Sequence, residues 1–275
     1  MKIKLLAIDM DGTALCDDHA TISDENRAAI EKAIAKGVNV LTATGRVKGR
    51  VPEQMSAIPG QRYLITSNGA VLTDLVNNKT LYSNLIPLKT ALQVMDALDG
   101  LDIYKEAYCN GECYTEFKKA HMVEQFPVPP WRCAMLAHGR KMVDDLRCHI
   151  QTEGVTLEKI NLPFLPVDVQ EEIRFRLNQI SGISLTSSVE HNIEINSEAT
   201  TKAKALAYLC ELLGVSPEET MAMGDGGNDV EMLEFAGCSI APANAGDLIR
   251  KTARYTTHAT NNESAVAEAI NQFIL

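Results

Sequence analysis

Two aspartates, Asp9 and Asp11, stand at the end of a short apolar segment near the start of the chain, in the sequence DMDGT. In an extended segment the side chains at positions i and i+2 point the same way. We therefore expect residues 2–8 to form a buried strand that delivers both carboxylates to one place.

Three further segments resemble this one, because each ends an apolar run with small or polar residues. They are residues 42–46, 67–69 and 224–229. If all four are strand ends of one parallel sheet, they converge on the same crevice, which is where open α/β sheets bind ligands. Convergence would turn four short motifs into one site.

The last of these segments, GDGGND at residues 224–229, follows a predicted strand and precedes a predicted helix. Asp225 would then face the crevice. Asp9, Asp225 and a backbone carbonyl form a set of three oxygen ligands that suits Mg²⁺, which completes its octahedron with water and a substrate phosphate. The ion would reverse the repulsion between these acids and a phosphate.

Neutral and cationic donors accompany the acids. Lys202 opens a predicted helix, and Thr44 and Gly45 follow the predicted strand at residues 38–42. A lysine is a compact charge suited to phosphate, while a hydroxyl and a backbone amide donate to non-bridging oxygens. The combination indicates phosphoryl transfer, in which positioning and charge neutralisation supply most of the acceleration.

The elements that must position these residues alternate between strands and helices. Ser23 is a predicted N-cap for a helix that ends before Gly37, and a hairpin is expected over residues 70–83. The other expected strands and helices of this part are residues 63–66, 201–213, 220–223, 230–236 and 238–241. Alternation of this kind predicts a parallel sheet with helices on both faces.

The middle of the chain differs in character and contains helical patterns at residues 140–151 and 167–179. We interpret it as an α+β module inserted into the first domain. The predicted domains are a core made of residues 1–84 and 189–275, and an insertion made of residues 85–188.

Composition limits the class of protein. The chain has 275 residues, of which 45% are hydrophobic and 23% charged, and its net charge of −10 argues against a nucleic-acid partner. No apolar run approaches the roughly 18 residues of a membrane span, and the N-terminus has no signal-peptide pattern. The seven cysteines include no CxxC pair, which favours free thiols and a cytoplasmic location. We expect a monomer or a small homo-oligomer.

With these motifs in place, the whole chain resembles the haloacid dehalogenase superfamily of phosphohydrolases, and in particular its Cof-type branch with a large cap. DMDGT matches the first motif, TATGR the second, TTKAKAL the third and GDGGND the fourth, while SNGA at residues 67–70 is typical of the branch. The resemblance implies a Rossmann-like, doubly wound parallel sheet with an inserted α+β cap domain that selects the substrate. It also implies a magnesium-dependent phosphomonoesterase for small phosphorylated metabolites such as sugar phosphates.

The resemblance assigns roles to individual residues. Asp9 would be the nucleophile that forms an aspartyl-phosphate, and Asp11 the acid and base for the leaving oxygen and the water. The implied phosphate-binding residues are Met10 through its amide, Thr44, Gly45, Lys202 and Asn228. The implied metal ligands are Asp9, the Asp11 carbonyl and Asp225. Asp229 would contact these ligands without binding the metal itself.

Two details qualify the match within the superfamily. Dehalogenases of this fold lack an acid at the position of Asp11, so a halide-releasing reaction is disfavoured. The third motif usually has glycines beside its lysine, whereas this chain reads EATTKAKAL, which leaves the local backbone path open and makes Lys204 a weaker substitute for Lys202.

Several readings stay open. A phosphomutase or phosphotransferase would use the same residues with a different acceptor, and a binding protein with a silent site is a further alternative. Arg46 either reaches the substrate or pairs with an acid, Asn68 either shapes its turn or touches phosphate, and His19 reads as a surface residue. Candidate substrate-selecting residues of the insertion are Tyr104, Tyr108, Glu112 and Tyr114.

Overall fold

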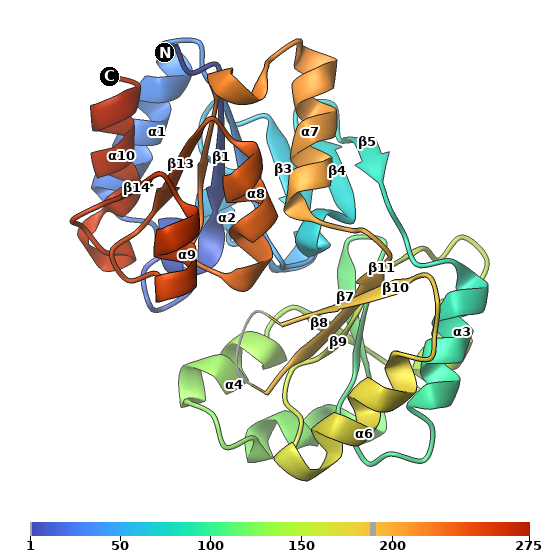
Figure 1. The fold of residues 1–275 in the computed structure, drawn as a ribbon. Coiled ribbons are helices and arrows are strands. Elements are labelled where there is room, and N and C mark those ends of the chain that lie inside the picture. The colour runs from blue at the N-terminus through green and yellow to red at the C-terminus, as the bar shows by residue number, and fades with distance from the viewer. Residues whose placement is uncertain (1, 188–190) are drawn as a thin grey trace. The chain divides into compact units, whose positions relative to one another are not determined.

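The computed structural model of the chain describes residues 2–187 and 191–275. The chain divides into two compact units (Figure 1). The first consists of Met1–Gly45, Val51–Ser83 and Thr201–Leu275, and the second of Arg46–Arg50 and Asn84–Thr200. In the described part of the chain, no helix combines the length and the apolar character needed to cross a membrane.

The first unit is built on an eight-stranded sheet with the order β14-β13-β12-β1-β2-β3-β4-β5. The strands are β1 (Leu5–Asp9), β2 (Asn39–Ala43), β3 (Tyr63–Thr66), β4 (Val71–Asp74), β5 (Lys79–Ser83), β12 (Thr220–Met223), β13 (Cys238–Ala241) and β14 (Tyr255–Thr256). Neighbouring strands from β14 to β3 are parallel. β4 pairs in the antiparallel direction with both β3 and β5. Because β12 and β2 lie on opposite sides of β1, the strand order reverses at β1.

Helices cover both faces of this sheet (Figure 1). They are α1 (Asp24–Ala35), α2 (Glu53–Ser56), α7 (Lys202–Leu213), α8 (Val230–Phe235), α9 (Asp247–Thr252) and α10 (Ala265–Phe273). Buried side chains of α1 and α10 pack with Leu6 and Ile8 on one face, and those of α7, α8 and α9 pack with Leu5 and Ala7 on the other. Alternate residues of β1 therefore serve two cores, and both faces of the strand must be apolar.

The second unit contains a six-stranded sheet with the order β10-β11-β9-β6-β7-β8. Its strands are β6 (Glu106–Cys109), β7 (Glu112–Glu116), β8 (Arg140–Val143), β9 (Leu157–Leu162), β10 (Ile183–Thr186) and β11 (Ile193–Ser197). Its helices are α3 (Leu88–Ala97), α4 (Pro130–Ala137), α5 (Leu146–Ile150) and α6 (Val167–Leu177). α3, α5 and α6 pack on the apolar face of the sheet.

The opposite face of this second sheet is polar and centres on an ion pair. Arg50 donates to both carboxylate oxygens of Glu106, at 3.1 and 2.8 Å, and both side chains are buried. Burial alone would raise the pKa of Glu106, but Arg50 holds that pKa below its ordinary value. Lys159 and Glu194 form a second buried pair on this face at 2.7 Å.

The structure confirms the predicted fold, a doubly wound parallel sheet with an α+β insertion. Local signals are visible at the predicted helix ends. The side chain of Ser23 accepts a hydrogen bond from the Asn26 amide at the start of α1, and Gly214 ends α7 in the left-handed conformation. The hairpin expected over residues 70–83 is β4 and β5.

Two expectations for the middle of the chain are wrong. The helix predicted over residues 140–151 is strand β8 followed by the short helix α5, because residues 140–143 pair with β7. Residues 193–197, predicted with the core, form β11 of the second sheet, where they pair with β9 and β10. Residues 46–50 also belong to the second unit. The predicted boundary between residues 188 and 189 lies outside the described residues.

Candidate active site

The candidate site lies at the carboxyl ends of three neighbouring strands of the first sheet. Asp9 ends β1 and is in register with Ala43 of β2, so Thr44 follows one residue beyond. On the other side of β1, Ile8 is in register with Met223, the last residue of β12. The parallel register therefore brings the first, second and fourth motifs to one edge, as the sequence predicts.

Lys202 joins this edge from the start of α7. The side chain of Thr201 caps the helix by accepting a hydrogen bond from the Lys204 amide. The Lys202 ammonium donates to Asp9 Oδ1 at 2.5 Å and to Asp229 Oδ1 at 2.7 Å, and its side chain is fully buried. The lysine of the third motif thus contacts the first and fourth motifs, although the glycines that usually flank this lysine are missing.

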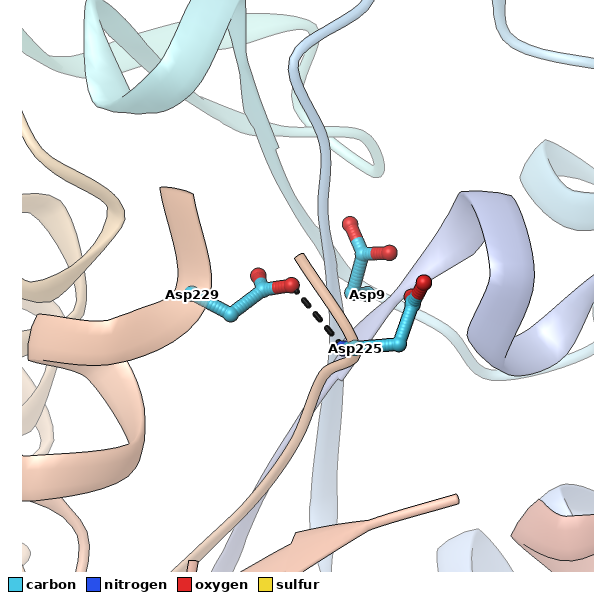
Figure 2. Close-up of side chains that lie close together, drawn as sticks. All are labelled: Asp9, Asp225 and Asp229. Carbon is cyan, nitrogen blue, oxygen red and sulfur yellow. Dashed lines mark hydrogen bonds between the residues drawn. The ribbon is translucent and has the colours of Figure 1, made fainter. Parts of the chain in front are cut away.

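Three carboxylates surround one point. Oxygens of Asp9, Asp225 and Asp229 lie within 4.8 Å of one another, and Figure 2 shows the three side chains together. Asp229 is held by Lys202 on Oδ1 and by the Asp225 and Gly226 amides on Oδ2, at 3.1 and 2.9 Å. Both oxygens of Asp229 thus accept hydrogen bonds from the protein. Asp229 is therefore suited to hold the loop that carries Asp225 and to orient Lys202.

Two close approaches fix the loops around Asp225. The Thr13 hydroxyl donates to Asp225 Oδ1 at 2.7 Å. Gly12 has φ +74°, and a Cβ atom there would lie 2.3 Å from Asp225 Oδ2. Only glycine combines this backbone conformation with this contact.

The charges in this cluster do not balance. Burial, and then Asp229, raise the pKa of Asp9 well above its ordinary value, and the same two causes raise the pKa of Asp225 to about 6. Burial alone would lower the pKa of Lys202, but Asp229 and Asp9 outweigh it and raise that pKa. When all three acids are ionised, they exceed the charge of Lys202 by two, which fits a divalent cation held by oxygen ligands.

Neutral hydrogen-bonding groups of the second and fourth motifs lie close together through Asn68. Asn228 donates its amide to Asn68 Oδ1 at 3.0 Å. The backbone of Gly45 lies against the same amide, since a Cβ atom there would be 2.7 Å from Asn68 Oδ1. The backbone N–H of Asn68 donates to the Thr44 carbonyl at 3.1 Å. Asn68 therefore links the second and fourth motifs, in addition to forming a turn with φ +60°.

The remaining candidates divide between the units. Asp11 lies in the turn Met10–Ala14, and the side chain of Met10 is buried in the core of the first unit. Arg46 belongs to the second unit and donates to the Arg50 carbonyl at 3.2 Å.

The four candidate substrate-selecting residues also belong to the second unit. Tyr104 and Tyr108 are buried beside Glu106. Glu112 pairs with Lys141, and Tyr114 stacks near His149. Their role as selectors stays a prediction.

Sequence reasoning missed two contacts of the site. Thr13 binds Asp225, and His19 Nδ1 lies 2.8 Å from Asp11 Oδ1. Thr13 lies in the first motif itself and could have been named there. His19 is eight residues from Asp11 in an irregular turn, where no helix or strand period relates the two, so its contact depends on the path of the loop.

The comparisons with known proteins agree with this geometry. A family model of haloacid dehalogenase-like hydrolases matches residues 6–270. The chain is 34% identical to the Bacillus subtilis 5-amino-6-(5-phospho-D-ribitylamino)uracil phosphatase YcsE, over 99% of this chain and 96% of that protein. It is 30% identical to the putative phosphatase YxeH of the same organism, over 99% and 98%. A solved haloacid dehalogenase-like hydrolase from B. subtilis superposes with a TM-score of 0.85 at 27% identity, covering 99% of this chain and 100% of that one.

Proposed function

The chain belongs to the haloacid dehalogenase-like hydrolases and is a phosphatase of that family, and from this premise we propose that it is a magnesium-dependent phosphomonoesterase that forms an aspartyl-phosphate. The observation that carries the proposal is the buried contact of Lys202 with Asp9 and Asp229, beside Asp225. This contact brings the proposed nucleophile, the Lys202 ammonium and a cluster of carboxylates together at one strand end.

Asp9 and Asp225, with the Asp11 carbonyl, would hold Mg²⁺, and Asp229 would orient them. The bound ion would neutralise the phosphate oxygens. Lys202 engages Oδ1 of Asp9 and so orients Oδ2 as the attacking oxygen. Met10 through its amide, Thr44, Gly45, Lys202 and Asn228 would bind the phosphoryl oxygens.

The reaction would have two steps, and Asp11 would regain in the second the proton that it gives up in the first. Asp9 attacks phosphorus, the ester oxygen leaves, and Asp11 donates its proton to that oxygen. Asp11 then accepts a proton from the water that attacks the aspartyl-phosphate, which releases phosphate and restores Asp9. Acid and base assistance of this kind is worth about a hundredfold to ten-thousandfold.

We further propose a sugar or polyol phosphate as substrate. The relative YcsE is named for a substrate with a phosphorylated ribityl chain, and it aligns with almost the whole of this chain. The second unit has one polar sheet face, with Tyr108, Lys159 and Glu194, opposite its apolar face, and we propose that the polar face is the one turned toward a hydroxylated substrate. We propose that this unit acts as the cap that selects the leaving group, in a cytoplasmic enzyme that is a monomer or a small homo-oligomer.

The test is hydrolysis of an aryl phosphate by the purified protein with Mg²⁺. Asp9→Asn should abolish turnover and the incorporation of labelled phosphate into the protein. Asp11→Asn should still become labelled from a good aryl leaving group but release the label slowly. Retained turnover in Asp9→Asn would refute the nucleophile assignment.

A panel of phosphorylated metabolites, including the ribityl compound named for YcsE, would identify the substrate. The same panel separates the phosphotransferase alternative, in which labelled phosphate would appear in a second metabolite rather than free in solution. The alternative of a silent binding protein is disfavoured because the relatives are named phosphatases.

A further inference from the structure

His19 lies in a tight turn that brings its ring to the acid of the first motif. Its Nδ1 is 2.8 Å from Asp11 Oδ1, and the two side chains are 22% and 34% exposed. In its ionised state the Asp11 carboxylate only accepts hydrogen bonds, and Nδ1 then donates to it. Asp11 itself has extended backbone angles, φ −76° and ψ 123°, within an irregular turn.

The turn is fixed independently of this contact. Leu15 and Ile22 form an antiparallel bridge across its base, and the Cys16 amide donates to the Thr21 carbonyl at 2.8 Å. Asp18 Oδ1 accepts from the amides of Ala20 and Thr21, at 2.9 and 2.8 Å.

Two asparagine side chains from the segment just before α10 also hold this turn. Asn261 donates to the Leu15 carbonyl and to Asp17 Oδ1, each at 3.0 Å, and Asn262 accepts from the Asp17 amide at 3.0 Å. The turn therefore has its own support from a distant part of the sequence.

This scaffold holds His19 in the left-handed region, with φ +56°. That conformation is uncommon for a residue with a side chain, and it persists where the surroundings over-determine it. Non-glycine residues held in this way cluster at functional sites. Here the conformation aims the imidazole at Asp11, whereas a surface histidine would need no such arrangement.

We propose that His19 is a positioning residue for Asp11. Its Nδ1–H fixes Oδ1, so that Oδ2 of Asp11 faces the ester oxygen in the first step and the water in the second. The inference rests on the proposed role of Asp11 as acid and base. Because misplacement of a catalytic group by about 1 Å can cost about a hundredfold in rate, loss of this hydrogen bond should be measurable.

The test variant is His19→Gly, because glycine accepts the left-handed backbone and removes only the imidazole. Its kcat/KM for an alkyl phosphate should fall about tenfold to a hundredfold, since a poor leaving group needs the proton of Asp11. Its kcat/KM for 2,4-dinitrophenyl phosphate should stay within about threefold of the wild-type value, since that leaving group needs no proton. The kcat for the same aryl ester should nevertheless fall, because Asp11 must still activate water in the second step.

Conservative rescue and a matched control separate positioning from stability. His19→Asn, whose amide can donate and which tolerates the left-handed region, should recover most of the alkyl phosphatase activity. The His258 side chain is fully exposed, and its Nδ1 lies 3.0 Å from Glu268 Oε1, so His258→Ala should behave as wild type. The melting temperature of each variant checks the fold.

Asp11→Asn distinguishes failure of this inference from failure of the proposed function. If Asp11→Asn shows the leaving-group dependence and His19→Gly does not, the positioning role is overturned while the acid assignment stands. If Asp11→Asn lacks that dependence, the acid assignment itself fails. In the Asp11→Asn background, His19→Gly should have no further effect, and an equal loss there would also overturn the proposal.

Discussion

Lys202 places a buried ammonium between two buried carboxylates, and the third acid of the cluster stands beside them. Removing one partner of a buried ion pair is costly because the remaining charge stays desolvated. We therefore expect the same lysine to stabilise the fold and to orient Asp9, the proposed nucleophile. Both properties can be measured by substitution.

Lys202→Met should abolish phosphatase activity and lower the free energy of unfolding by about 3–5 kcal/mol in metal-free buffer. The measurement is urea unfolding followed by circular dichroism, with the m-value compared between proteins. Lys204→Met is the matched control, because Lys204 is exposed two residues further along α7. A large activity loss in the control would restore Lys204 as the functional lysine.

Magnesium should stabilise the protein in a pH-dependent way. The pKa of Asp225 is raised to about 6, against about 3.9 in an unfolded chain. Between these values the folded state binds more protons, so the metal-free protein loses stability as the pH rises, and the loss is complete above pH of about 6. A bound divalent cation removes this penalty because it requires the ionised carboxylate.

We therefore expect Mg²⁺ at a hundred times its Kd to add about 2.7 kcal/mol at neutral pH and progressively less toward pH 5. Scanning calorimetry with Mg²⁺ or with EDTA at several pH values measures this difference. Asp225→Asn should be more stable than wild type without metal at neutral pH and should gain little from Mg²⁺. A Mg²⁺ effect that is equal at pH 5 and pH 7.5 would contradict the assignment of Asp225.

At the scale of elements, the turn Ser67–Gly69 after β3 packs against the start of α7. Gly69 has φ +103°, and a Cβ atom there would lie 2.1 Å from the Thr201 carbonyl oxygen. This is backbone rather than a flexible side chain, so the contact cannot relax without moving α7. The glycine thus sets the position from which Lys202 reaches Asp9.

Gly69→Ala should lower both stability and activity, by more than the roughly 1 kcal/mol expected from the left-handed backbone alone. Gly37→Ala is the matched control, because Gly37 has φ +86° and nothing within 4 Å of its would-be Cβ. Thermal unfolding and aryl phosphate hydrolysis measure the two effects. Equal losses in both variants would show that backbone strain, and not the contact with Thr201, is responsible.

Elements with local signals could be predicted from the sequence. Ser23 and Gly214 mark the ends of α1 and α7, and the apolar run of β1 is buried on both sides. The segment at residues 140–143 carries no such signal, and its pairing with β7 decides its conformation. Likewise, residues 193–197 join the second sheet through long-range pairing that no local pattern encodes.

The candidate site follows the same division. Parallel strands of one sheet end at one edge, so the first, second and fourth motifs could be brought together from their strand positions alone. Lys202 starts a helix, and its place in the site was expected from the order of the family's motifs. The contact of His19 with Asp11 depends on a left-handed turn held by Asn261 from the other end of the chain, more than 240 residues away. Loop paths of this kind are set by tertiary contacts, and the sequence therefore predicted a surface histidine.

At the scale of the whole molecule, the two units have separate hydrophobic cores. The five-residue segment Arg46–Arg50 belongs to the second unit, although most of the surrounding sequence belongs to the first. Its Arg50 neutralises Glu106 in the second sheet. The second unit thus depends on a short piece of chain contributed from outside its main segment.

Arg50→Met should lower the stability of the second unit by about 3–5 kcal/mol, because Glu106 would remain buried without its partner. Trp131 is the one tryptophan of the sequence and lies within the chain range of this unit, so tryptophan fluorescence is specific to this unit. Far-UV circular dichroism reports both units. The proposed Mg²⁺ ligands lie in the first unit. Mg²⁺ should therefore shift the transition of that unit in circular dichroism and leave the fluorescence transition of the Arg50→Met protein largely unchanged.

Arg147→Met provides the control for this measurement. Arg147 pairs with Asp96 at the surface of the second unit, with side chains 40% and 63% exposed. Pairs of this kind contribute up to about 1 kcal/mol. A fluorescence transition displaced as far by Arg147→Met as by Arg50→Met would show that burial of the Arg50 pair has no special weight.

The separation of Asp9 and Lys202 along the chain, 193 residues, has a consequence during synthesis. The ribosome completes the entire second unit before it adds the lysine, the last loop of acids and the asparagine that braces the His19 turn. A polypeptide released early would carry Asp9, the proposed nucleophile, without its counter-charge. Incomplete products should therefore be inert toward phosphate esters in the cell, and hydrolysis should begin only once the C-terminal segment has closed the sheet.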